Sequence, residues 1–164
     1  MSYTRGWPIE PVGRSARSAA ATLARITLTK RQELLSTVPL FAGFKKRELA
    51  SIARVTETAR FQHGHEIVVE GSPGDFCCII VEGAADVIKG GSQIARFGPG
   101  DLFGELAILD PGPRSATVRT VTEVVAIRVQ RDAFLKAATA DPRVALRILE
   151  VLARRLRETT ERLD

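Results

Sequence analysis

The 164-residue sequence predicts one α+β domain built on an antiparallel β-roll, of the double-stranded β-helix or jelly-roll type. Two observations favour this fold. Residues 57–129 consist of short β-branched runs bounded by glycine-rich turns, with no helical stretch between them. On both sides of this region the apolar residues return to helical spacing. We therefore expect helices within 29–56, a roll over 57–129, and two C-terminal helices within 130–163.

Residues 1–28 lack apolar periodicity and contain several Gly, Pro and Ser residues, which predicts a flexible arm. The net charge of +5 resides in residues 1–31, which hold six basic residues and one acidic residue, whereas the other 133 residues hold 18 of each. A basic arm can attract nucleic acid or anionic lipid. The positions are sparse and no aromatic follows Trp7 among them, so a solvated tail is favoured over a nucleic-acid interface.

Two short helices are expected before the roll. Thr29 is the expected N-cap of the first, which contains Leu34 and Leu35 and ends before Pro39. The second helix covers residues 45–55. Its apolar stripe comprises Leu49, Ile52 and Ala53.

The predicted strands are short apolar runs that end at Gly or Pro. They cover residues 66–69, 76–81, 85–88, 116–119 and 124–129. The longest wholly apolar run, residues 76–81, is far too short to cross a membrane. Cys77 and Cys78 are neighbours on this strand and so point to opposite faces, which excludes a disulfide framework and favours a cytoplasmic location.

The last two helices are predicted over residues 132–138 and from Pro142 onward, with Asp141 as the cap of the second. The final helix carries two apolar stripes, so we expect it to pack on the roll through one and on a second copy or another protein through the other. The first stripe comprises Val144, Ile148 and Val151. The second, the leucine seam, comprises Leu149, Leu152, Leu156 and Leu163.

The residues with the clearest chemistry are Gly104, Glu105 and Arg114. A glycine lets the backbone approach a ligand closely, amides that open a short helix can bind an anion, and an arginine supplies the countercharge. The carboxylate would serve hydroxyl groups, as a ribose offers. Together these groups indicate a receptor for a ribose cyclic phosphate. The alternative is a surface ion pair between Glu105 and Arg114, which would contribute little.

The segment FGELAILDPGPRSATV, residues 103–118, closely resembles the phosphate-binding cassette of the cyclic-nucleotide-binding domain family. The resemblance extends over about residues 34–158. It implies that Arg114 pairs with the exocyclic phosphate oxygens, together with the backbone amides of Ala107 and Ser115, and that Glu105 accepts the ribose 2′-hydroxyl. The predicted ligand-binding residues are Gly104, Glu105, Leu106, Ala107, Arg114, Ser115 and Ala116.

The resemblance also bears on the ligand. Ser115, directly after the arginine, is similar to the bacterial cAMP pattern, so we expect cAMP, with cGMP as the alternative. Asp75 either braces Arg114, as in kinase regulatory subunits, or is a plain turn residue. Arg147, Arg154 and Arg155 of the last helix could stack on the base, although a solvated helical face is the favoured interpretation.

We therefore expect a stand-alone sensor that passes ligand binding through its C-terminal helices to a partner or a dimer. No enzyme or metal site is expected, because His63 and His65 are the two histidines and no catalytic triad or third ligand accompanies them. The chain ends at Asp164 without a helix-turn-helix after the last helix, so we expect no direct operator binding. An interaction scaffold with no physiological ligand and a regulator that binds nucleic acid through its arm are the alternatives.

Overall fold

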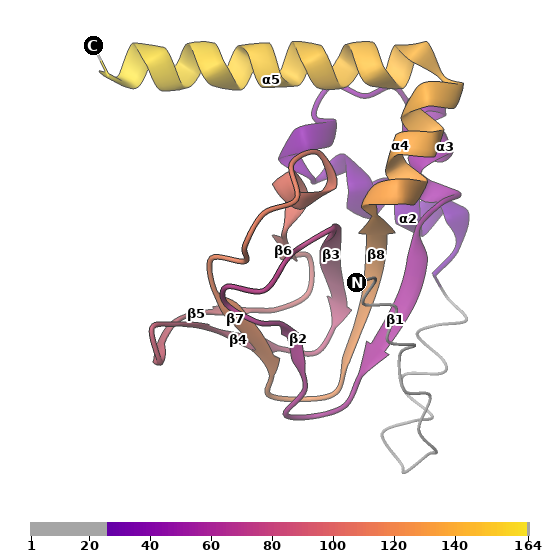
Figure 1. Cartoon of the computed structure of the whole chain (residues 1–164). Coiled ribbons are helices and arrows are strands. Elements are labelled where there is room, and N and C mark those ends of the chain that lie inside the picture. Colours follow the sequence, from indigo (N-terminus) through magenta and orange to yellow (C-terminus); the bar gives the residue numbers. More distant parts are fainter. Residues whose placement is uncertain (1–25, 164) are drawn as a thin grey trace.

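The computed structural model describes residues 26–163 and contains two four-stranded antiparallel sheets with helices gathered at one end (Figure 1). The strand orders are β1-β8-β3-β6 and β2-β7-β4-β5. The strands are β1 Glu57–Phe61, β2 Glu66–Val68, β3 Phe76–Glu82, β4 Ala85–Lys89, β5 Ser92–Phe97, β6 Leu102–Phe103, β7 Thr117–Thr120 and β8 Val124–Gln130. The predicted α+β roll with flanking helices is confirmed.

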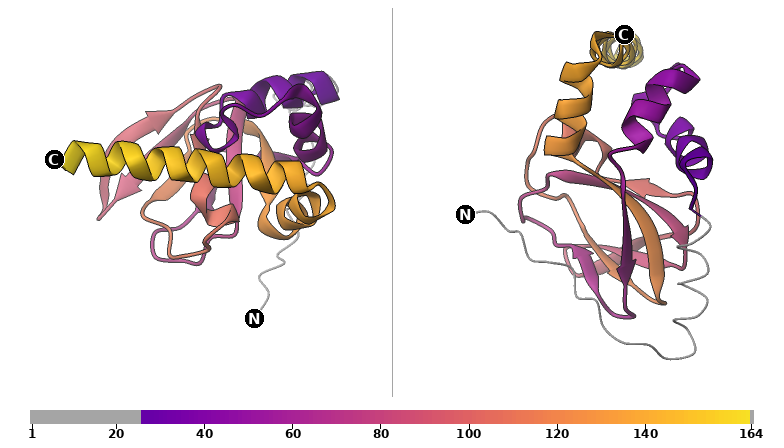
Figure 2. Two further views of the ribbon diagram at one scale, coloured as in Figure 1. Left: turned by 90° about the horizontal axis from the view of Figure 1, so that it is seen from above. Right: turned by 90° about the vertical axis from the view of Figure 1, so that its right-hand side faces the viewer.

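The α-helices come from both ends of the described chain and meet on one side of the roll, where the short turn η2 from the middle of the chain joins them (Figures 1 and 2). They are α2 Leu28–Ser36, the 3₁₀ turn η1 Pro39–Phe41, α3 Lys46–Ala53, the 3₁₀ turn η2 Glu105–Ile108, α4 Arg131–Ala140 and α5 Pro142–Leu163. Arg31 anchors α2 to the start of the roll, since its guanidinium donates to Thr56 Oγ1 at 2.6 Å and Thr58 Oγ1 at 2.8 Å. Among the helices of residues 26–163, none is both long and apolar enough to cross a membrane.

The start of α2 differs from the expected start. Thr27, not Thr29, is the N-cap: its backbone is extended and its hydroxyl accepts the N–H of Lys30 at 3.2 Å, whereas Thr29 already lies inside the helix. Ile26 is buried in the core. The rest of the expected basic arm lies outside the described residues.

The first sheet is covered on both faces, which explains why its central strands β3 and β8 are almost continuously apolar. Cys77 belongs to the core between this sheet and the helices, and Cys78 belongs to the core between the two sheets. Both thiols are free and fully buried. Burial raises the pKa of Cys78 to about 12, so this thiol stays protonated near neutral pH.

Three strands were not among the predicted runs: β1, β5 and β6. Strand β5 is exposed along nearly its whole length and shows no apolar alternation. Its place depends on the hairpin with β4, whose turn uses Gly90 and Gly91 at φ values of 57° and 80°. Strand β6 has two residues and leads directly into η2.

Helix α5 packs on the body through one of its two predicted stripes. Val144, Ile148 and Val151 are buried, while Leu149, Leu156 and Leu163 are 64%, 69% and 83% exposed. Leu152 packs partly against the helix-side core. The expected start of the helix is confirmed, because it begins at Pro142 and Asp141 Oδ1 accepts the N–H of Arg143 at 3.1 Å. Figure 1 shows that α5 then continues well past the helices on which it packs.

Candidate functional site

The candidate site begins where β6 ends. Gly104 follows Phe103 with φ 77°, a left-handed conformation that favours glycine, and serves as the N-cap of η2. A Cβ at Gly104 would come within 2.7 Å of the carbonyl oxygen of Phe76 and 2.3 Å of Nη1 of Arg114. The backbone therefore approaches β3 and the arginine more closely than another residue would allow.

Arg114 is buried, with 9% of its surface exposed. Its Nη2 donates to the carbonyl oxygen of Phe76 at 2.9 Å, and its guanidinium carbon lies 4.6 Å from the centre of the Phe76 ring. Desolvation lowers the pKa of Arg114 from its ordinary value, and the nearby Cys78 and Asp75 act in the opposite direction. No carboxylate within residues 26–163 forms an ion pair with it.

This environment bears on two expectations. The charge of Asp75 favours the charged form of Arg114, but no ion pair joins the two side chains, so the braced arrangement is not formed here. A surface ion pair between Glu105 and Arg114 is also not formed. Buried cations are normally paired. An arginine buried without a counterion is a strong candidate for binding an anion.

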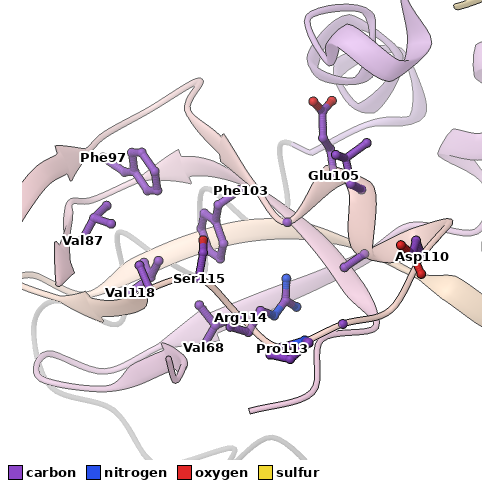
Figure 3. Close-up of a pocket in the computed structure, with 15 residues that line it drawn as sticks. Val68, Val87, Phe97, Phe103, Glu105, Asp110, Pro113, Arg114, Ser115 and Val118 are labelled. Carbon is purple, nitrogen blue, oxygen red and sulfur yellow. The ribbon is translucent and has the colours of Figure 1, made fainter. Parts of the chain in front are cut away.

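Glu105 is oriented toward the helices instead. Its Oε2 accepts the backbone N–H of Leu40 at 3.2 Å, and its Oε1 accepts Nη2 of Arg155 from α5 at 3.0 Å. Figure 3 shows its carboxylate pointing away from Arg114. Arg155 is thus the one of the three arginines considered on the last helix that reaches the site, and it contacts Glu105 through an ion pair.

The two backbone amides expected at a phosphate differ in their availability. The N–H of Ala107 donates to the carbonyl oxygen of Gly104 at 3.1 Å, inside η2. The N–H of Ser115 has no acceptor within the described part of the chain. Only the Ser115 amide is therefore available to an anion without a rearrangement.

All seven predicted ligand-binding residues line one pocket with a volume of about 500 Å³ (Figure 3). This volume lies within the range typical of small-molecule sites. The pocket also has an apolar wall that the sequence analysis did not identify. This wall comprises Val68, Val87, Phe97, Phe103 and Val118. Phe97 and Phe103 stack within it, with ring centres 5.7 Å apart.

The wall residues come from β2, β4, β5, β6 and β7, which are far apart in the sequence. The sequence carries a weak signal for this wall, because Val87 and Val118 are inward-facing residues that lie opposite each other in the register of the paired strands β4 and β7. That register becomes visible only when the pairing of β4 with β7 is known.

The family model for the cyclic nucleotide-binding domain matches residues 58–141, just over half of the chain. The chain belongs to this family. The match contains the whole roll after the start of β1, the cassette and α4.

Two curated relatives are regulatory proteins. The "CRP-like cAMP-activated global transcriptional regulator" of Mycobacterium tuberculosis is 35% identical over 136 residues, which is 80% of this chain and 61% of the relative. A cAMP-dependent protein kinase regulatory subunit of Emericella nidulans is 39% identical over 105 residues, which is 63% of this chain and 26% of that protein. The chain thus spans less than two thirds of either relative. Both are regulators, in agreement with the expectation that the chain is not an enzyme.

Among solved structures, the N-terminal domain of a transcriptional regulator from Streptomyces coelicolor matches with a TM-score of 0.72 and 30% identity. The match covers 80% of this chain and 95% of that domain. The alignment supports the roll with flanking helices as the fold of this chain.

Proposed function

We propose that the protein is a cyclic-nucleotide sensor that binds cAMP in the pocket of the cassette and signals through α5. The observation that carries this proposal is Arg114, a buried guanidinium that has no counterion among residues 26–163 and lies at the wall of a nucleotide-sized pocket. A cyclic phosphate has exocyclic oxygens that suit this charge and fork geometry. The cAMP-activated relative from M. tuberculosis supports cAMP as the ligand.

In this proposal the phosphate contacts Arg114 and the backbone amide of Ser115, and Gly104 permits the close approach. The ribose 2′-hydroxyl donates to Glu105, whose carboxylate must turn from the helices or share an oxygen with them. The Ala107 amide contributes only if η2 rearranges. Leu106, Ala116 and the apolar wall contact the sugar and the base. The apolar wall offers the base few polar groups that could distinguish adenine from guanine. We therefore compare cGMP with cAMP as the ligand.

A calorimetric titration of the full chain with cAMP, cGMP and 5′-AMP tests the assignment. We expect cAMP to bind most tightly and 5′-AMP, which has an open and more highly charged phosphate, to bind at least about tenfold more weakly. Binding of none of the three would favour the interaction scaffold. A further titration with DNA at two salt concentrations tests the basic arm, because phosphate contacts weaken steeply as salt rises.

We further propose that the signal passes to a second copy of this chain along α5. Leu149, Leu156 and Leu163 recur at seven-residue intervals on a face that does not contact the roll. Exposed apolar stripes of this kind usually mark an interface. The free thiols of Cys77 and Cys78 fit a cytoplasmic location.

The dimer is tested by sedimentation of the double variant Leu149→Glu/Leu156→Glu. Leu152 is left in place, since it packs partly on the core. We expect the native chain to sediment as a dimer and the variant as a monomer that still binds cAMP. A native chain that stays monomeric at high concentration, with and without cAMP, would assign the seam to a different protein.

A further inference from the structure

The loop between β2 and β3 supports Arg114 from outside the cassette. The loop forms two backbone hydrogen bonds with the arginine. The N–H of Arg114 donates to the carbonyl oxygen of Ser72 at 2.8 Å, and the N–H of Gly71 donates to the carbonyl oxygen of Arg114 at 2.8 Å. The N–H of Gly74 donates to the carbonyl oxygen of Gly112 at 3.0 Å. The position of the arginine backbone therefore depends on this loop.

Gly74 in this loop also determines where the arginine side chain can lie. A Cβ at Gly74 would come within 2.2 Å of Nε, 2.5 Å of Cζ and 2.7 Å of Cδ of Arg114. These distances are far below van der Waals contact, so the guanidinium occupies space that a side chain at Gly74 would fill. On the other side, Nη1 lies 2.3 Å from where a Cβ of Gly104 would be. Two glycines thus leave room for one guanidinium over the Phe76 ring.

The two glycines differ in what a substitution would disturb. At Gly104 the left-handed backbone and the carbonyl oxygen of Phe76 would also resist a side chain. Gly74 does not have a positive φ, and the nearest atoms to its Cβ all belong to the arginine side chain. A methyl group at Gly74 would therefore displace mainly the guanidinium, which can move without unfolding the domain.

We propose that Gly74 is a positioning residue for the anion site: the absence of a side chain there lets the Arg114 guanidinium lie over Phe76 and face the pocket. Its consequence for cAMP affinity rests on the proposed function. The steric coupling between Gly74 and Arg114 does not, and it can be measured without ligand.

The test compares Gly74→Ala with Gly98→Ala, a control at a glycine that has open space around it and no positive φ. The first measurement is the Nε–Hε resonance of Arg114 in the ligand-free protein, which we expect the Phe76 ring to shift in the native chain because the guanidinium carbon lies 4.6 Å from the ring centre. We expect Gly74→Ala to move this resonance toward the random-coil position and Gly98→Ala to leave it unchanged. An unchanged resonance in Gly74→Ala would overturn the proposal.

The second measurement is cAMP affinity. Displacement of one charged donor predicts a loss of about tenfold or more for Gly74→Ala and little change for Gly98→Ala. The loss should vanish in an Arg114→Ala background, because Gly74 acts through that side chain. An equal further loss in that background would overturn the positioning role. If the native chain binds no cAMP while the resonance still moves, the proposed function fails and the positioning role stands.

Should Gly74→Ala fail to fold, the double variant Gly74→Ala/Arg114→Ala decides the matter. The atoms with which the methyl group collides are then gone, so we expect the double variant to melt within a few degrees of Arg114→Ala alone. A double variant that is also unfolded would show that Gly74 serves the loop and not the arginine.

Discussion

Arg114 and Glu105 line the same pocket, but different parts of the molecule hold them. Arg114 is held by the roll: its backbone pairs with the loop before β3, and its guanidinium contacts Phe76 of β3. Glu105 is held by helices: Leu40 belongs to η1 and Arg155 to α5. The group expected at the phosphate is thus held against the roll, and the group expected at the ribose lies where three helical elements meet.

This difference suggests a division of labour within the proposed sensor. A ligand that contacts Arg114 meets a group that needs no movement of the helices. A ligand that engages Glu105 must compete with, or share, the contacts that this carboxylate makes to η1 and α5. A ligand changes a conformational equilibrium only through different affinities for the two states. We call the part of the pocket at Glu105 the ribose end and the part at Arg114 the phosphate end. We therefore expect the ribose end, more than the phosphate end, to couple binding to α5.

The largest effect should come from the phosphate end. Arg114→Ala removes a buried charged partner, so we expect cAMP and cGMP affinities to fall by roughly a hundredfold or more. Burial of the Arg114 charge costs free energy, and the substitution removes this cost together with the contacts of the side chain. The melting temperature of the ligand-free chain should therefore fall little. Calorimetry and thermal unfolding measure the two quantities.

Arg119→Ala is the matched control for this variant. Arg119 lies on β7, shortly after Arg114 in the sequence, but its guanidinium is about half-exposed and pairs with Glu66. Exposed pairs contribute little, so affinity should stay unchanged. If Arg114→Ala binds within about threefold of the native chain, the phosphate end lies elsewhere and the comparison fails.

The two ends of the pocket also differ in how far they could be predicted from the sequence. The phosphate end is nearly contiguous: Gly104, Arg114 and Ser115 lie within a short segment whose composition and resemblance indicated the site. The roll followed from the β-branched runs and their glycine-rich boundaries. In each case the decisive information is local.

The contacts of Glu105 could not be predicted in this way. Leu40 and Arg155 lie 65 and 50 residues away from it, and they meet it only because η1, η2 and α5 pack together. The apolar wall likewise depends on strand pairing, and the space at Gly74 depends on the arginine of a distant loop. Glycine in a turn is ordinarily explained by backbone freedom, which gives no hint that a neighbouring side chain needs the room.

A smaller effect is expected at the ribose end, and it should depend on the ligand. Glu105→Gln keeps the shape of the side chain but removes its charge, so cAMP affinity should fall by about tenfold. The loss for 2′-deoxy-cAMP should be much smaller, because that ligand has no 2′-hydroxyl to donate. Parallel titrations of both ligands with both proteins give the comparison. Equal losses would mean that Glu105 serves the packing of the helices and does not contact the ribose.

The smallest effect concerns the contact of Glu105 with α5. Beyond Leu152, the ion pair of Arg155 with Glu105 is the one polar contact that joins α5 to the rest of residues 26–163. An ion pair of this kind contributes up to about 1 kcal/mol, so Arg155→Ala should speed amide exchange over residues 153–163 by at most about fivefold. Exchange in the roll should stay unchanged.

Arg154→Ala is the control for this measurement, because the adjacent Arg154 forms no ion pair within the described residues. Both substitutions cost the helix little, since alanine is a good helix former. The experiment uses the Leu149→Glu/Leu156→Glu background, so that self-association along the leucine seam does not protect the same amides. Faster exchange in Arg155→Ala alone would establish that the carboxylate expected at the ribose also secures the second half of α5. Equal rates in the two variants would mean that the ion pair of Arg155 with Glu105 does not secure the second half of α5, and that the ribose end has no more connection to the helix than the phosphate end.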